Sequence, residues 1–86
     1  MTRFILYSRS YCHLCDDMLT ALQAWRAVYA FSIEVIDIDA EPALVERYDE
    51  LVPVLCGSRH GEPMRQLCHY FLNDKIVPDF CIEPPG

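Results

Sequence analysis

Two cysteines three positions apart carry the clearest chemistry in this sequence. Cys12 and Cys15 form a Cys-x-x-Cys pair, which follows the apolar run 4–7 and stands at the start of a long helical pattern. Such a pair at a strand-to-helix turn, near a βαβ pattern, indicates a dithiol redox site. A helix N-terminus stabilises a thiolate, which is the reactive form of cysteine. The three-residue offset places the second sulfur one turn deeper on the same helical face, within reach of the first.

Other interpretations of the pair stay open at this point. Cysteine is often a small core residue, so both thiols could be ordinary buried side chains on a helix. Zinc usually takes four ligands, of which the pair would supply two. The residues that would supply the others are His13, Cys56, Cys68 and His69. An iron–sulfur cluster shared between two chains is a further alternative.

Three ionisable side chains lie next to the pair in the sequence. Asp16 and Asp17 fall in the first helical turn, where they favour the helix dipole but oppose a nearby thiolate. His13 lies between the cysteines, where an imidazolium would stabilise a thiolate and favour the reduced form. The alternative is an exposed histidine at the start of a helix, with no role in the chemistry.

Length and composition bound the kind of protein. The 86 residues, 52% of them hydrophobic, predict a single small domain over residues 1–86, with a frayed tail at about 83–86. The net charge of −6 argues against nucleic acid and anionic membranes as partners. Seven of the thirteen acidic residues fall between Glu34 and Glu50, and we interpret that stretch as a solvated acidic face.

Cysteine number and the N-terminal pattern indicate the compartment. Five cysteines is an odd count, unlike the even sets of secreted disulfide scaffolds. The early apolar run breaks at Ser8 and Arg9, so it is too short for a signal peptide or a membrane span. We therefore expect a cytoplasmic monomer with reduced thiols, in which Cys56 and Cys68 lie in the core.

The hydrophobic pattern predicts the elements that would position the pair. The predicted strands span residues 3–8, 31–38, 52–56 and 64–71, and the predicted helices span residues 12–30, 42–48 and about 74–81. A helix between the first two strands favours their parallel pairing. A short loop between the last two favours an antiparallel hairpin. The order β-α-β-α-β-β-α predicts an α/β fold with a mixed four-stranded sheet flanked by helices. Pro78 lies inside the last predicted helix, and a proline in the interior of a helix kinks or breaks it.

These elements and three motifs resemble the glutaredoxin-like branch of the thioredoxin superfamily. The segment 7–12 is similar to the glutaredoxin approach to its active site, where tyrosine, serine and a basic residue precede the motif. Cys12-His13-Leu14-Cys15 holds the dithiol position, and Val52-Pro53-Val54 resembles the cis-proline strand entry. The sequence resembles in particular small bacterial glutaredoxin-like proteins with a Cys-His-x-Cys centre.

The resemblance implies a thioredoxin/glutaredoxin-like fold and a thiol–disulfide oxidoreductase without a tightly bound cofactor. Cys12 would be the exposed nucleophile and Cys15 the buried resolving thiol. Arg9 would supply positive charge near the nucleophile or hold a substrate carboxylate. Tyr11 would cover the dithiol or lie on a docking surface.

The same resemblance assigns a role to the Val-Pro step. Pro53 would be in the cis form and would face the dithiol. Val52 would then offer its backbone N–H and C=O to an extended substrate segment, in the manner of strand addition.

One departure from the family bears on the substrate. Glutaredoxins that bind glutathione carry Gly-Gly-x-Asp before the last helix, whereas residues 70–74 here are Tyr-Phe-Leu-Asn-Asp, in which Asp74 alone matches. We expect the partner to be a disulfide-containing protein or a glutathione mixed disulfide, with glutathione as one candidate reductant. A binding module on a thioredoxin scaffold, with little turnover, and a zinc–dithiol protein are the alternative functions.

Overall fold

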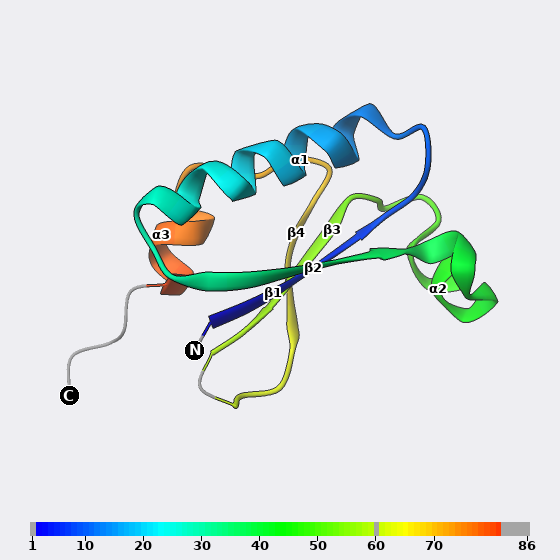
Figure 1. Cartoon of the computed structure of the whole chain (residues 1–86). Coiled ribbons are helices and arrows are strands. Elements are labelled where there is room, and N and C mark those ends of the chain that lie inside the picture. Colours follow the sequence, from blue (N-terminus) through cyan, green and yellow to red (C-terminus); the bar gives the residue numbers. More distant parts are fainter. Residues whose placement is uncertain (1, 60, 82–86) are drawn as a thin grey trace.

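Four strands in one sheet and three α-helices make up the part of the chain that the structure, a computed structural model, describes: residues 2–59 and 61–81 (Figure 1). The elements are β1 (Thr2–Ser8), α1 (His13–Ala24), β2 (Phe31–Asp37), α2 (Pro42–Tyr48), β3 (Val54–Ser58), β4 (Arg65–His69) and α3 (Ile76–Cys81), with 3₁₀ turns η1 (Trp25–Ala27) and η2 (Ile38–Ala40). This is the predicted order. The predicted frayed tail lies outside the described residues.

The sheet is mixed, with strand order β2-β1-β3-β4. β1 and β2 are parallel, as expected for strands joined through a helix. β3 is antiparallel to both β1 and β4, so the predicted hairpin is also confirmed. The central strand β1 is paired on both sides, which explains its nearly continuous apolar sequence.

Apolar side chains pack on both faces of the sheet. The larger core joins the sheet to α1 and α3 and consists of Phe4, Leu6, Met18, Leu22, Phe31, Leu55, Val77 and Phe80. The smaller core joins the other face to α2 and consists of Ile38, Tyr48, Val54 and Cys56. Successive side chains of a strand point to opposite faces, so β1 sends alternate residues into each core. The buried Cys56 confirms its predicted place in the core.

Strand β3 begins and ends later than the sequence predicts. We expected residues 52–56, whereas the strand spans Val54–Ser58. Pro53 has no N–H to give to a ladder, so pairing starts after it. Gly57 and Ser58 are residue types that favour turns, yet they pair with Phe4 and Arg3 of β1. Long-range pairing therefore overrides the local turn preference.

The two helices that flank the larger core also differ in detail from the prediction. The pattern predicted a helix to residue 30, but α1 ends at Ala24 and continues as η1 to Ala27. α3 forms in spite of Pro78, which is its third residue. The first N–H groups of a helix have no intrahelical acceptor, so a proline in the first turn removes no helical hydrogen bond.

Candidate active site

Strand register gathers the predicted site residues at one end of the sheet. Tyr7 of β1 pairs with Val54 of β3, and Val54 pairs with His69 of β4. Both strand pairs are antiparallel, so the chain that follows β1, the chain that precedes β3 and the chain that follows β4 meet at the same edge. The backbone N–H of Tyr70 donates to the carbonyl of Pro53 at 2.9 Å, which ties two of these segments together.

The two cysteines are joined to each other at the start of α1. Cys12 and Cys15 form a disulfide with their Cα atoms 5.2 Å apart, within the usual range for a disulfide. Cys12 is the N-cap residue of α1, and its sulfur accepts the backbone N–H of Cys15 at 3.2 Å. Cys12 is half-buried, whereas Cys15 is only 3% exposed. The pair is therefore not two separate core thiols.

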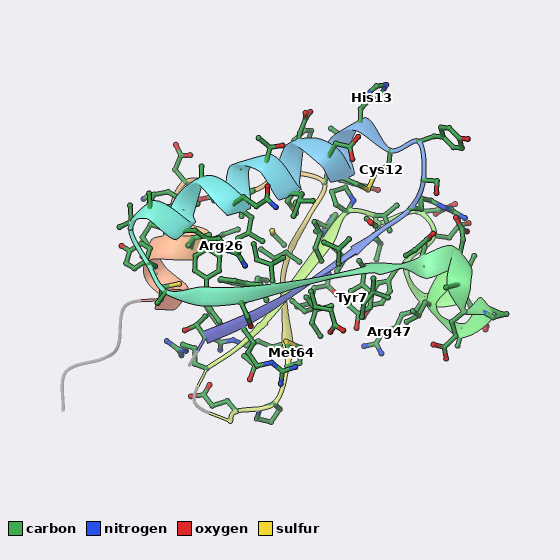
Figure 2. All side chains as sticks on the ribbon, in the orientation of Figure 1. Tyr7, Cys12, His13, Arg26, Arg47 and Met64 are labelled. Atoms are coloured by element: carbon green, nitrogen blue, oxygen red, sulfur yellow. A yellow bond between two sulfur atoms is a disulfide. The ribbon has the colours of Figure 1, made fainter. Side chains whose placement is uncertain are left out.

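The orientation of the pair suits an exchange reaction. Figure 2 shows Cys12 beneath the first turn of α1, on the side that faces the sheet, while His13 points away into solvent. The N–H that reaches the sulfur is one of the unpaired donors of the helix N-terminus. The same donor would stabilise a thiolate at Cys12 once the disulfide is reduced.

The Val-Pro step lies at the same edge of the sheet as the segment between β1 and α1. The Val52–Pro53 peptide bond is cis, and Pro53 is buried. The N–H of Val52 donates to the carbonyl of Tyr48 at 3.2 Å. This corrects the prediction that Val52 offers both backbone groups to a substrate, because its N–H closes the turn after α2. Its carbonyl accepts no hydrogen bond from the backbone of the described residues.

Arg9 is held by two carboxylates. Its guanidinium donates to Asp39 through Nη2 at 2.6 Å and through Nε at 3.3 Å, and Nη1 donates to Asp49. The end of β1 pairs with the end of β2, at Ser8 and Asp37, and this register brings η2 to Arg9. The hydrogen bond from Arg9 lowers the pKa of Asp39, and the two carboxylates raise the pKa of Arg9.

This ion-pair cluster differs from the role that the sequence suggested for Arg9. We expected positive charge near Cys12 or a site for a substrate carboxylate, but two carboxylates already balance the charge of Arg9. Asp39 and Asp49 both lie in the acidic stretch that the sequence pattern predicts to be a solvated face, so their contact with Arg9 was not expected. No local sequence pattern marks either carboxylate as a partner of Arg9. Only the register of β1 against β2 shows that Asp39 lies near Arg9.

The remaining predicted residues surround the dithiol at the surface. Tyr11 is fully exposed, at 105% of its reference area, so it does not cover the dithiol. Its backbone has a φ of 61°, in the left-handed region, where the chain turns from β1 into α1. His13 is exposed as well. Both side chains are therefore open to a docking partner.

Within residues 2–59 and 61–81, no three His, Cys, Asp or Glu side chains are grouped so that they could hold a metal ion. Over the same residues, none of the helices has the length and apolar character that crossing a bilayer requires.

Comparison with known proteins decides the family. The sequence pattern of the glutaredoxin-like domain (DUF836) matches residues 3–79, which is most of the chain. The chain belongs to the glutaredoxin-like domain family. A search of curated proteins found no match. The family match and the Cys12–Cys15 disulfide together support a redox function.

Two solved structures resemble this chain in both sequence and fold. A protein from Nitrosomonas europaea, solved in solution by NMR, is 32% identical with a TM-score of 0.80, over 94% of this chain and 92% of that chain. A protein from X. campestris is 26% identical with a TM-score of 0.58, over 90% and 92% of the two chains.

A more distant neighbour defines the fold. The oxidized form of mitochondrial thioredoxin 3 from Saccharomyces cerevisiae is 15% identical with a TM-score of 0.67, over 93% of this chain and 76% of that one. At that identity the likeness concerns the fold alone. The glutaredoxin-like domain described here therefore has the predicted thioredoxin-like fold.

Proposed function

We propose that this glutaredoxin-like domain is a thiol–disulfide oxidoreductase that reduces disulfides through Cys12 and Cys15. The observation that carries the proposal is the disulfide at the start of α1, whose outer sulfur accepts a helix N-terminal N–H. That N–H favours the thiolate form of Cys12 in the reduced protein. The buried Cys15 is close enough to form a bond with Cys12 but shielded from a bulky substrate.

The exchange takes place in two steps. The Cys12 thiolate attacks one sulfur of the substrate disulfide, so a mixed disulfide forms and the other substrate sulfur leaves as a thiolate. Cys15 then loses its proton and attacks the Cys12 sulfur, which releases the second substrate thiolate and leaves the Cys12–Cys15 disulfide. Both substrate thiolates take protons from solvent. An external thiol or dithiol reductant returns two electrons to the domain and closes the cycle.

The roles of the neighbouring residues follow from this scheme. Tyr11 and His13 would contact the substrate at the surface, and the carbonyl of Val52 would accept one backbone hydrogen bond from it. Pro53 would hold that carbonyl beside the dithiol. Arg9 would position the loop that carries Cys12 through its carboxylate partners. No tightly bound cofactor is needed for any step, and a monomer is sufficient.

A reduction assay with matched variants tests the proposal. Insulin or a peptide mixed disulfide is given as substrate with dithiothreitol as reductant, and turnover is compared between wild type, Cys12→Ser and Cys15→Ser. We expect turnover in the wild type and background rates in Cys12→Ser. When Cys15→Ser is reduced, freed of dithiothreitol and then given the substrate, we expect a trapped one-to-one mixed disulfide on Cys12, seen by intact mass. Background rates in all three proteins would contradict the enzyme and favour a binding module.

A further inference from the structure

An apolar groove lies between α1 and the loop that follows β4. Leu14, which lies between the two cysteines, contributes to it together with Met18 and Ala21 of α1, and Tyr70–Leu72 contribute from the loop between β4 and α3. Its volume is about 200 Å³. Pockets for drug-sized ligands run from about 300 to 1,000 Å³, so this groove suits one large side chain rather than a whole small molecule.

Exposed apolar side chains line the groove and also flank the Cys-x-x-Cys pair in the sequence. Leu14 is 37% exposed, Tyr70 38% and Phe71 69%, and the fully exposed Tyr11 stands on the other side of Cys12 in the sequence. Exposed apolar side chains that gather at one place mark interaction sites. Leu14 lines the groove and lies two residues after Cys12, so a peptide joined to the Cys12 sulfur can reach the groove with a neighbouring side chain.

The charges at the groove are negative. Asp17 lines it, no Lys or Arg does, and Asp17 forms no ion pair within residues 2–59 and 61–81. Arg9, the cation nearest to Cys12 in the sequence, is bound by Asp39 and Asp49. A small anionic thiol such as glutathione, with two carboxylates, would therefore meet apolar walls and a carboxylate where it needs a cation.

We propose that the groove selects peptide disulfides whose cysteine has a large apolar neighbour followed by a Lys or Arg. This inference rests on the proposed function and names its substrate class. The apolar side chain enters the groove between α1 and the loop after β4, and the cation of the peptide lies beside Asp17. Burial of the apolar side chain supplies affinity, and the charge pair supplies selectivity against acidic peptides.

Four disulfide substrates test the proposal on the reduced wild-type domain. Three are symmetrical peptide disulfides built from Phe-Cys-Phe-Lys, Ser-Cys-Ser-Lys and Phe-Cys-Phe-Glu with blocked ends, and the fourth is oxidised glutathione. The rate of Cys12–Cys15 oxidation is followed by acid quench, alkylation and mass spectrometry. Each rate is divided by the rate of the same substrate with dithiothreitol, which removes differences in intrinsic disulfide reactivity.

We expect a clear order of corrected rates. The Phe-Lys peptide should exceed the Ser-Lys peptide by about ten-fold, because one large apolar side chain is buried. It should exceed the Phe-Glu peptide by about three-fold at low salt, and that ratio should approach one in about 0.5 M salt because the charges are exposed. Oxidised glutathione should be among the slowest substrates.

Variants test whether the two substrate preferences, Phe over Ser and Lys over Glu, arise from the groove. Phe71→Ser should remove most of the Phe-over-Ser preference, whereas Val28→Ser should keep it, because Val28 is similarly exposed at 64% but does not line the groove. Ala21→Gln, which fills the groove from an exposed helical position, should act like Phe71→Ser. Asp17→Asn should remove the Lys-over-Glu preference, and Asp79→Asn, which makes the same charge change elsewhere, should keep it.

The outcomes separate this inference from the proposed function. Equal corrected rates for all four substrates, or glutathione as the fastest, would overturn the groove proposal while leaving the oxidoreductase intact. A Phe preference that survives in both Phe71→Ser and Ala21→Gln would overturn it as well. If none of the substrates oxidises the Cys12–Cys15 pair of the reduced wild type, the proposed function itself fails.

Discussion

At the residue scale, the cysteines differ in how easily each becomes a thiolate. Burial, with a smaller effect of the nearby Cys56, raises the pKa of Cys68 to about 11. Burial also raises the pKa of Cys56 and of Cys81. Cys12 instead lies at the start of a helix, where its sulfur accepts an N–H. The same residue type is therefore protected at three sites and exposed to chemistry at one.

This difference predicts selective alkylation of the reduced, folded domain. Iodoacetamide at pH 7.5 should label Cys12 first, while Cys56 and Cys68 should stay unlabelled because they remain protonated thiols at that pH. Peptide mapping by mass spectrometry measures the order. In urea all sites should be labelled, which is the control for access. Labelling of Cys68 as fast as Cys12 in the folded protein would contradict the prediction.

Arg9 gives a second prediction at this scale. Its hydrogen bond lowers the pKa of Asp39 in the folded state, so the pair stabilises the fold above the unfolded pKa, near 3.9, and loses that effect as pH falls through the lower folded pKa. Arg9→Ala should therefore have a lower Tm than wild type at pH 7, and the two Tm values should converge below about pH 3. Thermal melts across this range measure the difference.

A double-mutant cycle is the control for the Arg9 prediction. Asp39→Asn should lower the Tm in the same pH range, and the combination with Arg9→Ala should lower it by less than the sum of the two single changes. An Arg9→Ala effect that is the same at pH 7 and at pH 2 would show that the ion pair is not its cause.

At the scale of elements, strand β3 passes close beneath α3. A Cβ added at Gly57 would lie 2.8 Å from Cδ1 of Leu67 and 2.8 Å from Cε2 of Phe80. Side-chain carbons do not approach so closely, and both neighbours are packed against the larger core. The glycine is therefore needed for the contact between the sheet and α3, although its sequence context suggested a turn.

This contact predicts the cost of a small substitution. Gly57→Ala should lower the free energy of unfolding by about 1–3 kcal/mol, because the added methyl group overpacks the site. Urea unfolding measures it. Gly61→Ala is the comparison: its φ of 79° costs about 1 kcal/mol or more, but nothing lies within 4 Å of its Cβ. Phe80→Leu should therefore couple to Gly57→Ala and not to Gly61→Ala.

At the scale of the whole molecule, two cores of unequal size hold one sheet. The larger core joins β1, β2 and β3 to α1 and α3, and the smaller core holds α2 against the opposite face. α1 carries Met18 and Leu22 into the larger core on one side and presents the dithiol at its N-terminus. The element that stabilises the fold is therefore also the element that positions the chemistry.

Two leucines of α1, Leu22 and Leu14, should differ in how much they contribute to the free energy of unfolding. Leu22 is fully buried, so Leu22→Ala should lower the free energy of unfolding by about 2–5 kcal/mol, a large share of the 5–15 kcal/mol of a typical domain. Leu14 is partly exposed, so Leu14→Ala should cost less than about 1 kcal/mol. Urea unfolding measures both. Equal losses would contradict the assignment of Leu14 to the surface.

Much of the fold followed from local patterns in the sequence. The apolar run at residues 4–7 and the helical spacing after Cys15 predicted β1 and α1, because periodicity reflects which face of an element is buried. Pro42 marked the start of α2. The boundaries of β3 were wrong by two residues, since pairing with β1 draws Gly57 and Ser58 into the ladder.

By itself, the sequence determined the dithiol, its place at the start of a helix and the order of the elements, since each depends on residues close together in the chain. Only the tertiary structure decided that Arg9 is bound by carboxylates 30 and 40 residues away, and that the loop at residues 70–72 forms a groove with α1. Strand register places these segments at one edge of the sheet. Because register depends on long-range pairing and on which side chains the cores bury, no local pattern specifies it.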